Sequence, residues 1–187
     1  MEKINKFLLS SLVLVLGIVL VVGFSLPNMN FSPQVNSQGI DYEGSVCVTH
    51  TNADGEVLSN ECNHNVLFTT GAELIETALG TGTADACDWI ELCNATAGCG
   101  TPEADSSEAY TAYGAICGLN AVAGTVASNG DGNWSVSNTF TSTCDNILTN
   151  VTHLTNDNDD EFAGNSFTLV TLQSSDQLLI NWTISVS

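Results

Sequence analysis

The pattern of apolar and polar residues is clearest over Gln177–Ser187, with the sequence QLLINWTISVS. Large apolar side chains alternate there with mostly polar ones; the apolar set is Leu178, Ile180, Trp182, Ile184 and Val186. Because successive side chains of a strand point to opposite faces, the pattern predicts a strand with one buried face. Two placements fit this pattern. The strand lies in its own sandwich, or it completes the sheet of a neighbouring copy, as in donor-strand filaments.

The same pattern predicts further strands separated by turn-rich loops. They lie around Trp89–Leu92, Ile116–Ala127, Trp134–Thr143, Ile147–Leu154, Phe167–Leu172 and Leu178–Val186, and a hairpin around Asp54-Gly55 precedes them. One segment, TTGAELIETALG, predicts a helix with a capping box of Thr70 and Glu73 and an end at Gly80. The fold class expected is therefore mainly β: an antiparallel β-sandwich, Ig-like or jelly-roll-like, with one short helix.

The start of the chain predicts export. Phe7–Leu26 are 20 residues without a charge, which is long enough to cross a bilayer as a helix. Lys3 and Lys6 precede this segment, and the positive-inside bias keeps them in the cytoplasm. Both a retained transmembrane anchor and a signal peptide cleaved after Ser25 fit. We therefore expect an anchor or signal helix (residues 1–26), an extended stalk (27–41) and an extracellular domain (42–187), which is secreted or held at the outer face of the plasma membrane.

The charge balance limits the partners that the chain can have. It has 21 Asp and Glu against two Lys and Arg, and a net charge of −19. Both bases precede Phe7, so the exported part has none. Binding to nucleic acid or to anionic lipid head groups draws on Lys and Arg contacts, so neither partner is expected. The expected partners are the membrane, through the N-terminal helix, and other copies or other surface proteins.

The seven cysteines of an exported domain predict disulfides. If Asp54-Gly55 is a two-residue turn, counting outward places Cys47 opposite Cys62, within disulfide distance. Cys93 and Cys99 flank a short loop, NATAG, and Cys117 and Cys144 both lie in β-like sequence. Cys87 is left over, which indicates an intermolecular bridge or a different pairing. A zinc site of Cys87, Cys93, Cys99 and His64 is the alternative, although no Cys-x-x-Cys pair is present.

Other candidate sites carry weaker signals. Asn-x-Ser/Thr triplets offer glycosylation sites at Asn30, Asn94, Asn133, Asn150 and Asn181. The loop NDNDDE offers the oxygen ligands Asp157, Asp159, Asp160 and Glu161 to calcium, and the alternative is a solvated hairpin tip. SNGDGN, residues 128–133, is likewise read as a hairpin turn. No cofactor other than calcium is expected.

Catalysis has little support in the sequence. His50, His64 and His153 have no nucleophile-elbow serine near them, and no HExxH motif occurs. The acid pairs Asp85/Asp88 and Glu103/Asp105 are of the type that a glycosidase uses, but such pairs arise readily among 20 acids. We expect a protein that is not an enzyme.

Three segments carry a resemblance to known proteins: WIELCNATA (Trp89–Ala97), GNWSVSNTFT (Gly132–Thr141) and NSFTLVTLQSSDQLLINWTISVS (Asn165–Ser187). Over Asn65–Ser187 the chain resembles a loosely defined group of secreted archaeal proteins with β-sandwich domains, similar to viral and phage fibre or appendage proteins. The resemblance implies a structural surface role without catalytic residues. Cys93 stands where the group would have glycine, so the loop geometry of the group need not hold here and a family-specific disulfide is the alternative.

Three functions remain open at this point. The first is a structural or adhesive protein of the cell surface, of which a filament or appendage subunit is one form. The second is a membrane-anchored module that binds a ligand, such as a carbohydrate or a calcium-dependent ligand. The third is a secreted hydrolase, which would need acids and a histidine to converge in a cleft.

Overall fold

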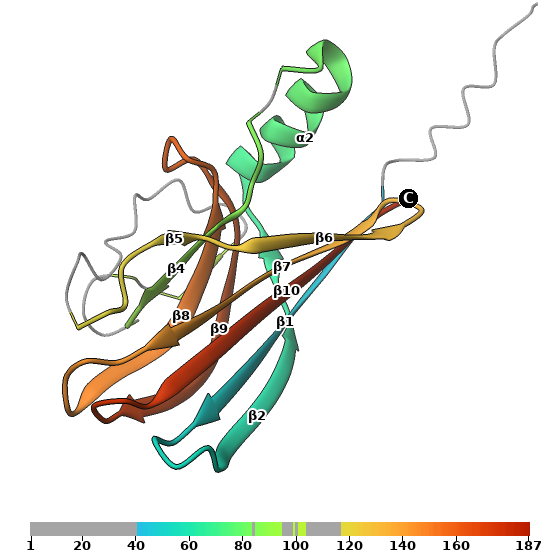
Figure 1. The fold of residues 1–187 in the computed structure, drawn as a ribbon. Coiled ribbons are helices and arrows are strands. Elements are labelled where there is room, and N and C mark those ends of the chain that lie inside the picture. The colour runs from blue at the N-terminus through green and yellow to red at the C-terminus, as the bar shows by residue number, and fades with distance from the viewer. Residues whose placement is uncertain (1–40, 84, 95–98, 100, 104–116) are drawn as a thin grey trace, which may run out of the picture. The chain divides into compact units, whose positions relative to one another are not determined.

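Two antiparallel sheets of five strands each make up the fold of the computed structural model, which describes residues 41–83, 85–94, 99, 101–103 and 117–187 (Figure 1). The strands are β1 (Tyr42–Thr51), β2 (Val57–His64), β3 (Val66–Leu67), β4 (Trp89–Cys93), β5 (Val122–Ala123), β6 (Thr125–Gly130), β7 (Asn133–Thr141), β8 (Ile147–Thr155), β9 (Glu161–Leu172) and β10 (Gln177–Val186). The helix α2 (Thr69–Thr81) lies between β3 and β4 in the sequence. The mainly β class and the single short helix of the described residues are as predicted, and the arrangement is consistent with a β-sandwich.

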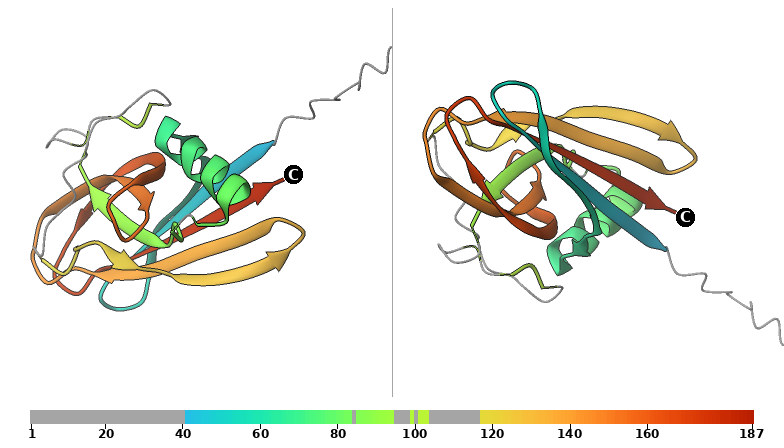
Figure 2. Two further views of the ribbon diagram at one scale, coloured as in Figure 1. Left: turned by 90° about the horizontal axis from the view of Figure 1, so that it is seen from above. Right: turned by 90° about the horizontal axis from the view of Figure 1, so that it is seen from below.

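The closing strand lies inside its own domain. Sheet A has the order β2-β1-β10-β7-β6, so β10 has β1 on one side and β7 on the other (Figure 2). Sheet B has the order β3-β9-β8-β4-β5. Leu178, Ile180, Trp182 and Ile184 are all fully buried and face sheet B, where Ile90 and Leu92 belong to the same core. The apolar face predicted from alternation is therefore covered within the chain.

The predicted pairing of Cys47 with Cys62 holds, but the predicted turn is wrong. The hairpin closes between Asn52 and Glu56, where the Asn52 N–H donates to the Glu56 carbonyl at 2.9 Å. The Asn52 side chain also accepts from the N–H groups of Asp54 and Glu56. This loop is one residue longer than predicted, and a β-bulge beside His50 shifts the register back. The two deviations cancel.

The predicted helix caps are also wrong. The residue at the N-terminal cap of α2 is Phe68, with no side-chain cap, and the helix ends at Gly82, which has the left-handed φ of 69°. Packing sets the start, because Phe68 is buried and its N–H donates to the Phe162 carbonyl of β9. A fixed tertiary contact thus outweighs the local capping preference of Thr70 and Glu73.

The predicted strand over Ile116–Ala127 is divided between the two sheets. Ile116 lies outside the described residues, β5 pairs with β4 in sheet B, and β6 pairs with β7 in sheet A. The chain changes sheets at Gly124, where a Cβ would press on Val136 and on the Ser137 carbonyl. A glycine fits at this corner because the backbone approaches β7 closely.

The described residues belong to one compact unit, Gly39–Ser187. Among them no helix has the length and apolar character that a bilayer crossing requires. The predicted anchor or signal helix Phe7–Leu26 and the stalk before Asp41 lie outside the described residues.

Two glycines of α2 make a matched test of how the helix packs. A Cβ at Gly71 would collide with the Phe162 carbonyl, whereas one at Gly80 would meet nothing. We expect Gly71→Ala to lower the free energy of unfolding by about 1–3 kcal/mol, as overpacking does. Gly80→Ala should raise it by about 0.5–1 kcal/mol, because alanine favours the helix. Urea unfolding followed by circular dichroism measures both, and equal effects would contradict the packing of α2 on β9.

Candidate functional site

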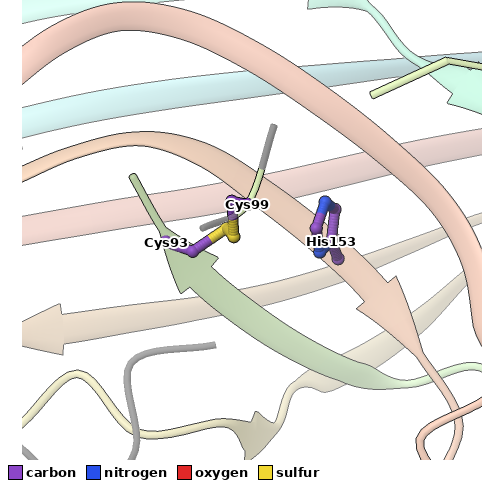
Figure 3. A group of neighbouring side chains, drawn as sticks. All are labelled: Cys93, Cys99 and His153. Carbon is purple, nitrogen blue, oxygen red and sulfur yellow. A yellow bond between two sulfur atoms is a disulfide. The ribbon is translucent and has the colours of Figure 1, made fainter. Parts of the chain in front are cut away.

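A disulfide packed beside a buried histidine forms the most concentrated group of reactive side chains in the described residues (Figure 3). Cys93 is the last residue of β4, Cys99 follows six residues later in the sequence, and His153 lies on the neighbouring strand β8. The two sulfur atoms and a ring nitrogen of His153 all lie within 4.8 Å of one another. The three side chains are 2%, 1% and 0% exposed.

The pairing of β4 with β8 brings this cluster together. Glu91 is the partner of His153 and Cys93 is the partner of Val151, so all four side chains lie on the face of sheet B that points away from sheet A. Cys93, Cys99 and Val151 form a small apolar cluster separate from the main core. The site therefore lies on the outer side of the sheet.

Residues from two other segments cover this outer face. The Phe68 ring meets the His153 ring edge-on, with 5.8 Å between the ring centres. Gly164 of β9 is the partner of His153 on the other side, and a Cβ there would press on Phe68 and Pro102. The missing side chain of Gly164 gives the start of α2 and Pro102 room to lie over the site.

Burial determines the charge of the two titratable groups on this face. It lowers the pKa of His153 to about 4, so the imidazole is neutral at pH 7. Burial, followed by the charge of Asp159, raises the pKa of the Glu91 carboxyl. A neutral imidazole next to two sulfur atoms is a soft donor set of the kind that zinc takes when the sulfurs are thiolates.

The structure contains the three disulfides expected from the sequence: Cys47–Cys62, Cys93–Cys99 and Cys117–Cys144. Their Cα–Cα distances are 4.0, 6.1 and 5.2 Å. Three disulfides are compatible with an extracellular location. The zinc alternative named two residues wrongly, because His153 and not His64 lies beside Cys93 and Cys99, and Cys87 is not part of the group. The signal missed was the alternation of β8, which places His153 on the face of Val151.

Cys87 is the free cysteine of the described residues, and its surroundings disfavour the thiolate. Burial, followed by the charges of Asp88, Asp160 and Asp85, raises the pKa of its thiol to about 12. The half-buried side chain lines a pocket of about 330 Å³ between α2 and β6–β7, with Ile75 and Trp134 among its neighbours. An intermolecular bridge through Cys87 therefore stays a prediction, and its reactivity would be low.

The acidic loop over Asp157–Glu161 is a hairpin tip between β8 and β9. The Asn156 side chain closes it, since its Oδ1 accepts from the N–H groups of Asn158 and Asp160 and its Nδ2 donates to the Asp160 carboxylate. Among the described residues only the Cys93, Cys99 and His153 group brings three potential ligand atoms of these types together. The carboxylates of Asp157, Asp159, Asp160 and Glu161 do not gather in this way.

Two buried polar groups, His50 and Asp176, contact each other at the C-terminal end of β1. His50 Nε2 and Asp176 Oδ2 are 3.1 Å apart. Burial would raise the pKa of the Asp176 carboxyl, but hydrogen bonds from the Gln173 N–H and the His50 ring lower it overall. This pair joins β1 to the turn before β10 and has a structural role in the turn.

The remaining predicted site residues do not gather at one place. Asn94 is buried and donates to the Leu148 carbonyl, so its amide nitrogen is engaged in the folded chain. Asn133, Asn150 and Asn181 are half-buried in strands, and Asn30 lies outside the described residues. Asp85 accepts a hydrogen bond from Asn158, and Asp105 lies outside the described residues.

Comparison with known proteins gives no relative. No family model, no curated protein and no solved structure matches the chain.

Proposed function

We propose that the chain is a non-catalytic structural or adhesive protein of the cell surface, exported or anchored by Phe7–Leu26. Its domain is an Ig-like or jelly-roll-like sandwich, and a filament or appendage subunit is the form that the resemblance of Asn65–Ser187 supports. The observation that carries the proposal is the outer face of sheet A, which is polar, regular and almost free of charge.

The strand register defines this adhesive face. Its outward side chains are Glu43, Ser45, Cys47, Thr49 and Thr51 of β1, Gln177, Leu179, Asn181, Thr183 and Ser185 of β10, Asn133, Ser135, Ser137, Thr139 and Thr141 of β7, Thr125 and Ala127 of β6, and Val57, Asn60, Cys62 and His64 of β2. Val57 and Leu179 are the exposed large apolar side chains among them. Glu43 is the one carboxylate among them. Successive strands place these groups about 4.7–4.9 Å apart across the sheet.

Apart from Glu43, the acids of the described residues lie mostly elsewhere. Glu73 and Glu76 are on α2, and many others occupy loops, such as Asp54, Asp131 and Asp145. A body with a net charge of −19 repels other acidic bodies at short range. The adhesive face is where another surface can approach without that repulsion, and its hydroxyl and amide groups both donate and accept hydrogen bonds. These properties suit adhesion to a second copy or to a neutral, hydroxyl-rich surface.

Adding charge to the adhesive face tests the proposal. Beads carrying the full chain in detergent are exposed to immobilised full chain and to cellulose. Ser137→Asp combined with Thr183→Asp should reduce attachment by about tenfold or more, and 1 M salt should restore part of it by screening. Thr171→Asp, at an exposed position of β9 in sheet B, is the matched control and should attach like the wild type.

Two results would count against the adhesive face. One is a wild-type chain that attaches to neither surface, and the other is a charged variant that attaches as well as the control. The anchored ligand-binding module is the alternative function, and a melting temperature that rises with Ca²⁺ would support it.

A further inference from the structure

We propose that Cys93, Cys99 and His153 bind a zinc ion when the disulfide between the two cysteines is reduced. The site then has two exclusive states, a disulfide without metal and a dithiolate with zinc. The inference is independent of the adhesive face, because that face belongs to sheet A and this cluster to the outer side of sheet B.

The geometry favours this set over any other in the described residues. The three donor atoms already lie within 4.8 Å of one another, so small side-chain movements bring them to the 2.0–2.3 Å that zinc requires of nitrogen and sulfur ligands. His153 is held in place by its strand and by the Phe68 ring. Cys93 lies at the end of β4, and Cys99 lies six residues further along the chain.

Reduction with zinc binding and oxidation with zinc release interconvert the two states of the site. A phosphine reductant and one water convert the disulfide to two thiols, and the phosphine leaves as its oxide. Binding of Zn²⁺ then forms two zinc–sulfur bonds and one zinc–nitrogen bond and releases two protons from the thiols. Hydrogen peroxide then restores the sulfur–sulfur bond, because it takes two electrons from the two thiolates and, with two protons, becomes two waters, while the metal leaves as Zn²⁺. Three protein ligands leave one tetrahedral position for water.

The charges around the site favour a cation. Two thiolates neutralise Zn²⁺, so the buried complex avoids the cost of an uncompensated charge. The net charge of −19 raises the local concentration of divalent cations around the chain.

The test uses Co²⁺ as a spectroscopic substitute for zinc. The full chain in detergent, with Cys87→Ser to remove the free thiol, is reduced with the phosphine and titrated with Co²⁺. We expect a near-ultraviolet charge-transfer band from cobalt–thiolate bonds that saturates at one Co²⁺ per chain and is abolished by Zn²⁺. The unreduced protein should show no band, because a disulfide sulfur is not a thiolate.

Matched variants identify the ligands. Cys93→Ser with Cys99→Ser should abolish the band, whereas Cys47→Ser with Cys62→Ser should leave it unchanged. His153→Gln should weaken Co²⁺ binding by more than about tenfold, since loss of even an outer-shell partner commonly costs that much. Circular dichroism checks that each variant is folded, and Cys93→Ser alone serves if the double variant is not. No band in the reduced protein, or a band that survives loss of Cys93 and Cys99, would overturn the proposal.

Discussion

Trp182→Ala is expected to lower the free energy of unfolding by about 3–5 kcal/mol, a large part of the stability of a domain of this size. Trp182 is fully buried in the centre of the central strand of sheet A, with Val46 and Val136 as its strand partners. Its removal leaves a cavity that the two sheets cannot close without breaking their register. Guanidinium unfolding followed by circular dichroism measures the loss.

Thr183→Ala is the control for this substitution. Thr183 is the next residue of the same strand, but its side chain is exposed on the outer face. Its replacement should change the free energy of unfolding by less than about 0.5 kcal/mol. If both variants unfold at the same guanidinium concentration, or if the loss depends on protein concentration, β10 is not seated in its own sandwich.

Loss of the Cys117–Cys144 disulfide should have the second large effect. The bond spans 27 residues of sequence, and the entropy it removes from the unfolded chain grows with loop length. Replacing both cysteines with serine should cost about 2–5 kcal/mol. The bond joins Cys117 to the segment after β7, where the Thr143 N–H donates to the Cys117 carbonyl. Thermal unfolding at pH 7 reports the loss.

Cys87→Ser is the control for this substitution, because it removes a cysteine side chain without removing a disulfide. Cys87 forms no disulfide and is half-buried, so its replacement should cost less than about 1 kcal/mol. A Cys117/Cys144 variant as stable as the Cys87 variant would show that the cross-link contributes nothing to stability.

The sequence predicts those features of the fold that depend on the local periodicity of apolar and polar residues. The buried face of β10, the sheet position of Cys47 opposite Cys62 and the single helix all follow from periods of two or 3.6 residues. The pairing of Cys47 is right partly because a longer turn and a bulge offset each other. At Gly124 the chain passes from β5 in sheet B to β6 in sheet A, and the β-like sequence pattern continues across this point without revealing the change of sheet.

The grouping of Cys93, Cys99 and His153 could not be predicted from any local sequence pattern. It depends on β4 pairing with β8, which is some 60 residues away, and on Phe68 and Pro102 covering the far side of that sheet. The choice of His64 over His153 failed for this reason. Spacing along the chain relates Cys93 to Cys99, but only the sheet register relates either of them to a histidine.

The place of β10 between β1 and β7 has a consequence for how the protein is made. Sheet A joins strands from the beginning and the end of the described domain, so its β1–β10 pairing closes a long loop and forms slowly. A ribosome that delivers β1 first must deliver nearly 130 further residues before β10, the second strand that pairs with β1, arrives. During that interval sheet A lacks its central strand, so the apolar faces of β1 and β7 that pack beside β10 stay exposed to solvent.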